Sequence, residues 1–81
     1  MKIETTKKET LEIDINFPAY TKKSWIYYKI FSQEKIMRIV PEYYPEISKS
    51  SKEFAFGEGF EFVSEKEFET VLENVKKELG I

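Results

Sequence analysis

The sequence of 81 residues contains no cysteine and no histidine. Without them the chain cannot form a disulfide, a zinc finger, a haem site or an iron-sulfur ligand set. The Ser-His-Asp and Cys-His arrangements of hydrolases are excluded as well, because the chain supplies neither the base nor the thiol. Oxygen-only metal sites stay open, but no carboxylate group stands out as a ligand set. We therefore expect no enzyme, no metal site and no cofactor.

Long apolar runs are also missing, and residues 1–6 are mostly polar or charged. The sequence therefore predicts neither a signal peptide nor a membrane span, and a cytoplasmic location is the expectation that follows. The chain length suits one domain over residues 1–81, because a second hydrophobic core would need more residues.

The charges are unevenly distributed, although the net charge is only -2. Residues 1–52 carry ten Lys or Arg and seven acids, a balance of +3, whereas residues 53–81 carry three Lys and eight Glu, a balance of -5. Such an asymmetry is found at charged partner surfaces and also on helices with a solvated acidic face.

Apolar and polar residues alternate in several segments, which predicts antiparallel strands. Three strands are expected between prolines and polar turns: residues 10–17, 25–31 and 36–40. One further strand is expected over residues 54–62, with a bulge at its glycines. Residues 48–52 are polar and are interpreted as a loop, whereas the polar residues 21–24 lead into the strand at 25–31.

The C-terminal segment predicts an amphipathic helix from Glu65 to Leu79. Ser64 is suited to the N-cap position and Glu67 completes a capping box, while Gly80 supplies the left-handed residue after the last turn. The predicted fold class is α+β, a small antiparallel sheet of about four strands with this one helix packed on one face.

The hairpin expected at residues 25–40 is apolar on both faces. Tyr28 lies on one face with its isoleucine neighbours, whereas Trp25 and Tyr27 lie on the other. One helix covers only one face of a sheet. The other face therefore needs a loop, a second copy of the chain or a foreign partner.

Two sets of residues are candidate partner-binding sites. Aromatic and basic residues of the hairpin side can pack in the core, contact a protein or stack on single-stranded nucleic acid, and we select Trp25, Tyr27, Lys29 and Tyr44. The second set is a stripe of carboxylates at i+4 spacing on the helix, which engages a basic groove or is merely solvated. Its members are Glu65, Glu69 and Glu73.

Three segments carry a resemblance to a known group of proteins: Phe17-Pro18-Ala19-Tyr20, Tyr27-Tyr28-Lys29 and the helix entry from Ser64 to Phe68. In this layout the chain resembles short proteins of bacterial phages and mobile elements. That group includes inhibitors of host defence, anti-CRISPR proteins among them. The resemblance implies an anti-defence role in a bacterial host and assigns no functional residue.

The leading hypothesis is a non-enzymatic binding or inhibitory protein that occludes a surface of a larger protein or nucleoprotein. One alternative is a small RNA or single-stranded DNA binding module that uses the aromatic and basic hairpin face. Another is a structural homodimer that buries the uncovered hairpin face against a second copy.

Overall fold

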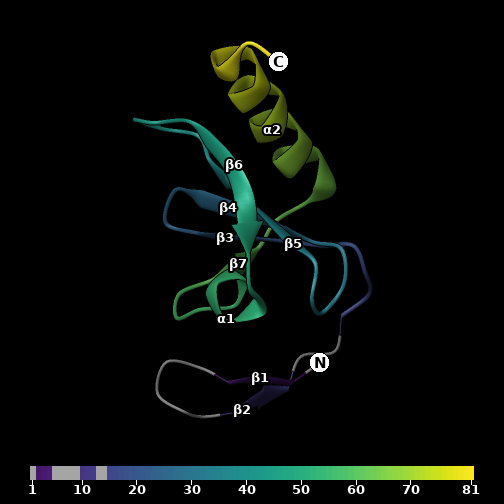
Figure 1. Cartoon of the computed structure of the whole chain (residues 1–81). Helices are drawn as coiled ribbons and strands as arrows, with labels where there is room; N and C mark the ends of the chain where they lie inside the picture. Colours follow the sequence, from purple (N-terminus) through teal and green to yellow (C-terminus); the bar gives the residue numbers. More distant parts are fainter. Residues whose placement is uncertain (1, 5–9, 13–14) are drawn as a thin grey trace.

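The computed structural model describes residues 2–4, 10–12 and 15–81. Within these ranges the chain forms a five-stranded antiparallel sheet, a separate two-stranded ladder and two helices (Figure 1). The α+β class and the antiparallel sheet are confirmed, and the main sheet has one strand more than the four expected.

The main sheet has the strand order β6-β5-β4-β3-β7, and every neighbouring pair is antiparallel. Its strands are β3 (Ala19–Lys23), β4 (Ile26–Ile30), β5 (Ile36–Val40), β6 (Glu46–Ser50) and β7 (Glu61–Phe62). Strands β3 to β6 follow one another as a meander, because short turns join each pair. Strand β7 follows α1 in the chain and pairs with β3, at the edge of the sheet opposite β6.

Helix α2 (Glu65–Leu79) lies across one face of this sheet (Figure 1). The Ser64 hydroxyl accepts a hydrogen bond from the Glu67 backbone N–H at 3.1 Å, and Gly80 ends the helix in the left-handed conformation. These bounds confirm the helix expected from the sequence. Its apolar side packs on the sheet in a cluster whose buried members are Tyr20, Ile39, Phe68 and Val75.

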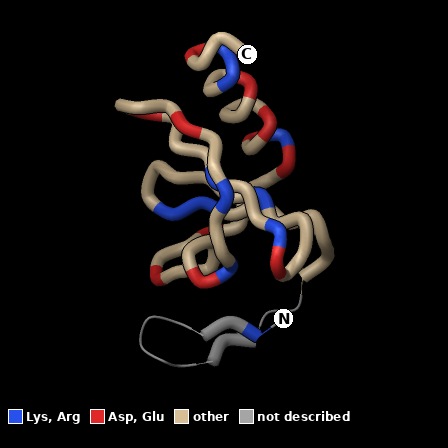
Figure 2. Tube along the Cα trace, in the orientation of Figure 1, with Lys and Arg blue, Asp and Glu red and all other residues tan. Residues whose placement is uncertain are grey.

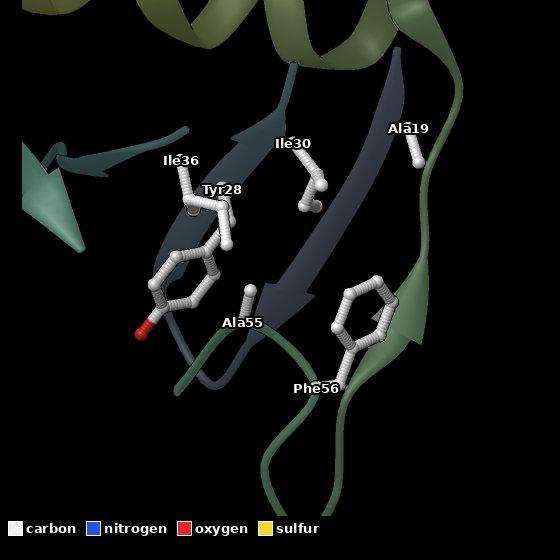
Figure 3. Packing of buried hydrophobic residues seen from close by; sticks show 6 residues of the cluster. All are labelled: Ala19, Tyr28, Ile30, Ile36, Ala55 and Phe56. Atoms are coloured by element: carbon white, nitrogen blue, oxygen red, sulfur yellow. The ribbon is translucent and has the colours of Figure 1, made fainter. Parts of the chain in front are cut away.

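The opposite face is covered by helix α1 (Lys52–Ala55) and the turn that follows it. Figure 3 shows Ala55 and Phe56 facing the side chains of strands β4 and β5. The buried members of this second cluster are Ala19, Tyr28, Ile30, Ile36, Ala55 and Phe56. Both faces of the hairpin are therefore covered by other parts of the chain, α2 on one side and the α1 segment with its turn on the other. Of the three occupants that the sequence left open, a loop segment is the one observed.

The ladder of β1 (Lys2–Glu4) and β2 (Thr10–Glu12) is separate from the main sheet. Strand β1 lies next to α1 (Figure 1). The strand expected over residues 10–17 is therefore wrong in its last part, because residues 15–17 form no strand. Residues 13 and 14 lie outside the described residues.

Two polar segments form strands that the sequence did not predict, residues 21–23 in β3 and residues 48–50 in β6. The loop expected over residues 48–52 is therefore wrong at residues 48–50. Thr21 is fully buried in β3, and its hydroxyl donates a 2.8 Å hydrogen bond to the carbonyl of Ala55. Residues 48–50 belong to edge strand β6, where polar side chains are satisfied by solvent and by cross-strand bonds. Arg38 of β5 donates from Nε to the Ser48 hydroxyl at 3.1 Å.

The further strand expected over residues 54–62 is found only at Glu61–Phe62, as β7, and is wrong over the rest of the segment. The segment forms α1, a turn and the two residues of β7. Its phenylalanines share one parity in sequence, but they meet as a ring cluster. The rings of Phe56 and Phe60 lie 5.2 Å apart edge to face, and those of Phe60 and Phe62 lie 5.4 Å apart. Aromatic packing is favourable in this geometry and does not require strand pairing.

On the sheet face that α1 covers, the phenol of Tyr28 is buried, and this changes its pKa. Burial raises the pKa of the Tyr28 phenol above its ordinary value, and the positive charge of Arg38 opposes part of that rise. The two residues are cross-strand partners in β4 and β5. At the edge of the sheet, hydrogen bonds from Ser48 and Arg38 and the positive charge of Arg38 lower the pKa of the Glu46 carboxyl.

Replacing Phe56 with alanine tests whether the α1 segment seals the second face. Phe56 is 2 % exposed, so Phe56→Ala should lower the free energy of unfolding by roughly 3 kcal/mol or more. Phe54→Ala is the matched control, because Phe54 is 66 % exposed, and a change within about 0.5 kcal/mol is expected there. Urea denaturation measures both free energies of unfolding. An equal decrease in the two variants would contradict the packing of the α1 segment on this sheet face.

The raised pKa of Tyr28 predicts a loss of stability at high pH. Its phenol keeps its proton more strongly in the folded chain, so the contribution is complete below the unfolded pKa of about 10 and is lost as pH rises above it. In Tyr28→Phe this decline should be shallower than in the wild type. The difference between urea midpoints at pH 8 and pH 11 measures it, and parallel pH profiles for both proteins would refute the assignment.

Candidate protein-binding site at the aromatic end of the sheet

Two hairpin turns project from the same end of the sheet. In an antiparallel meander, alternate turns lie at the same end, so the β3–β4 turn and the β5–β6 turn are neighbours (Figure 1). The first turn consists of Ser24 and Trp25, and the second spans residues 41–45. We call Trp25, Tyr43 and Tyr44 the aromatic end.

The aromatic end is the most exposed set of rings on this part of the surface. Trp25 is 45 % exposed, Tyr43 is 83 % exposed and Tyr44 is 87 % exposed. The rings of Trp25 and Tyr43 meet edge to face, with centroids 6.2 Å apart. Exposed tryptophan and tyrosine are enriched where proteins bind one another, because they bury a large area with few rotatable bonds.

Both turns hold a residue other than glycine in the left-handed region. Ser24 has φ +55° and Tyr43 has φ +61°. This conformation costs roughly 1–2 kcal/mol for residues with a Cβ atom, and strained residues gather at functional sites. The backbone strain is therefore located in the two turns that display the aromatic end.

A groove of about 420 Å³ separates the aromatic end from helix α2. Its walls are Ser24, Trp25, Tyr27, Pro41 and Glu42 from the sheet and Val71 and Asn74 from α2. Glu42 carries the only charge among these wall residues. Within the described part of the chain, its carboxylate forms no ion pair or hydrogen bond.

Tyr27 and Lys29 were selected from the sequence as contact residues, and both contact other parts of the chain. Tyr27 is half-buried beneath α2, with Lys22 Nζ 6.0 Å from its ring centroid. Lys29 Nζ lies 3.9 Å from a carboxylate oxygen of Glu69 and 4.9 Å from the Phe31 ring centroid. Lys29 therefore links the sheet to α2.

The three glutamates of the acidic stripe are exposed on α2. Figure 2 shows acidic and basic positions following one another along this helix. Glu69 turns toward Lys29, so the two surfaces selected from the sequence meet at this ion pair. Glu73 lines a shallow depression that also contains Lys66 and Lys77. The stripe is therefore interrupted by positive charge, which weakens the reading of Glu65, Glu69 and Glu73 as a continuous acidic surface.

Sequence reasoning selected Trp25 and Tyr44 but left Tyr43 and Glu42 out of the site. The prolines at 41 and 45 marked an irregular turn between two strands, which is the signal that could have grouped the intervening residues. The left-handed backbone at Tyr43 gave no signal, because tyrosine rarely adopts it.

Other kinds of site are not found in the part of the chain that the structure describes. No group of three acidic side chains there is arranged to hold a metal ion. Neither of the described helices is long and apolar enough to cross a membrane. Comparison of the chain with protein-family models, curated proteins and solved structures finds no match.

Replacing Ser24 with glycine tests the strain in the first turn. A two-residue turn with positive φ at its first residue is of the type that favours glycine there. Ser24→Gly should raise the free energy of unfolding by about 0.5–1 kcal/mol, after the larger chain entropy of glycine is subtracted. Ser32→Gly, in the opposite turn, should not stabilise. Urea denaturation compares them, and a loss of stability in Ser24→Gly would overturn the assigned strain.

Proposed function

We propose that this chain is a non-enzymatic binding protein that occludes a surface of a larger protein, and that the aromatic end is its contact surface. The observation that carries the proposal is the exposure of three large rings on two adjoining turns with strained backbones. The exposed surface of these rings contributes no hydrophobic stabilisation in the free protein. Contact with a partner would remove that surface from water, which is favourable.

The hairpin is covered on both faces by other parts of the chain. The uncovered apolar face expected from the sequence is absent from the described residues, so it supports neither a foreign partner nor a homodimer. The interaction role now depends on the aromatic end alone. This surface comes from turns, and turns commonly carry binding residues because a rigid sheet positions them.

The charges near the aromatic end favour a protein over a nucleic acid. Lys22 is directed to the Tyr27 ring, and Lys23 Nζ lies beside Gly57, so both turn back toward the chain. Glu42 contributes negative charge to the adjoining groove. A single-strand platform instead combines its rings with a positively charged path for the phosphates.

The resemblance to phage and mobile-element proteins selects the partners to test first. We propose that the chain acts in the bacterial cytoplasm on a host-defence component, with CRISPR effector proteins as the initial candidates. Occlusion by a small domain needs no catalysis, which agrees with the absence of cysteine and histidine from the sequence.

The test is affinity capture from a nuclease-treated bacterial lysate with matched variants. The wild-type chain should retain a protein at one-to-one stoichiometry, and Trp25→Ala with Tyr44→Ala should reduce its recovery at least tenfold. Losses of this size are typical when central aromatic contacts are truncated. The measurement is quantitative mass spectrometry of the captured proteins.

Phe54→Ala is the control, because it removes an exposed ring on α1, away from the aromatic end. It should leave recovery unchanged, and circular dichroism should report the same fold for all variants. Equal recovery by every variant would refute the aromatic end as the contact. Salt-sensitive binding of oligonucleotides at the same residues would replace the protein partner with a nucleic acid.

A further inference from the structure

We infer that the groove beside the aromatic end receives an arginine side chain of the partner. The inference rests on the proposed function and names the chemistry that the site recognises. Two observations carry it together: the Glu42 carboxylate has no partner among the described residues, and no cation of the described residues lies over the neighbouring Trp25 indole.

The chain already places lysines over several of its aromatic rings. Lys29 Nζ lies 5.6 Å from the Tyr20 ring centroid, and Lys35 Nζ lies 5.8 Å from that of Phe31. The indole of Trp25 attracts cations more strongly than either kind of ring. In the described chain, however, its aromatic partner is Tyr43 and no lysine or arginine lies over it.

Glu42 supplies the charge that such a cation needs. It lies on the same groove as Trp25 and Tyr27, and the described residues offer it no ion pair or hydrogen bond. Ser24 and Asn74 add side-chain oxygens to the groove walls. A cation in this place would therefore contact a carboxylate, neutral acceptors and an aromatic face together.

Arginine fits these walls better than lysine. Its guanidinium is planar, stacks on an aromatic ring and presents paired N–H donors to a carboxylate. An ammonium group is compact and more strongly hydrated, so it gains less from the flat indole. The volume of about 420 Å³ is also of the size that holds a whole side chain.

The experiment uses nuclear magnetic resonance with blocked tripeptides as probes. Trp25 is the only tryptophan in the chain, so its indole N–H gives one resonance that reports directly on the groove. The probe Gly-Arg-Gly, acetylated and amidated at its ends, should shift this resonance saturably. The same peptide with citrulline or glutamine in place of arginine should bind at least tenfold more weakly, because the charge is missing.

Glu42→Gln should weaken binding of the arginine peptide about tenfold or more. Glu34→Gln is the matched control, because it removes an exposed carboxylate from the turn at the other end of the sheet. It should leave the affinity unchanged. Equal binding of the arginine and citrulline peptides, or equal losses in the two variants, would overturn the inference.

The two proposals can fail separately. If Trp25→Ala abolishes capture of the partner while Glu42→Gln retains it and the arginine peptide shifts nothing, the aromatic end binds by apolar contact and only the arginine inference falls. If Trp25→Ala leaves capture intact while the arginine peptide binds, the groove is a ligand site and the proposed function falls.

Discussion

The hydrogen bond from the Thr21 hydroxyl to the Ala55 carbonyl holds the cover of the second sheet face in place. It joins the middle of β3 to the end of α1 at 2.8 Å, and Thr21 is fully buried. A buried carbonyl without a donor costs roughly 1–3 kcal/mol, so the Thr21 hydroxyl stabilises the α1 segment against the sheet. Phe56, directly after Ala55, packs with β3 and β4 in the same cluster, so the central strands have buried side chains on both faces.

The sequence predicted the elements whose signals are local. The bounds of α2 could be predicted because the residues that cap a helix, here Ser64 and Gly80, lie directly beside its ends in the sequence. Turns and a proline likewise marked the ends of β4 and β5. Thr21 could not be placed, because a polar residue is buried only when a distant carbonyl accepts its proton. Strand β6 was missed for a related reason. An edge strand exposes polar side chains, so its sequence is hard to tell from that of a loop.

The candidate site was predictable in part. Trp25 and Tyr44 are large and lie near turns, and their exposure agrees with their selection as contacts. Tyr27 is also a large aromatic residue, but it packs beneath α2, and Lys29 pairs with Glu69 of that helix. Which aromatic residues are exposed to solvent depends on the position at which α2 packs on the sheet. Strand register, which brings the turns of Trp25 and Tyr43 together, is a property of the fold and not of either segment.

Residues 52–62 both cover a face of the sheet and extend it, since Phe56 packs over the core and β7 pairs with β3. Detachment of this one segment would expose apolar side chains and the unpaired backbone edge of β3 at the same moment. Exposed edges next to apolar surface are templates for intermolecular strand pairing. We therefore expect aggregation under heat to begin from this local opening, ahead of global unfolding.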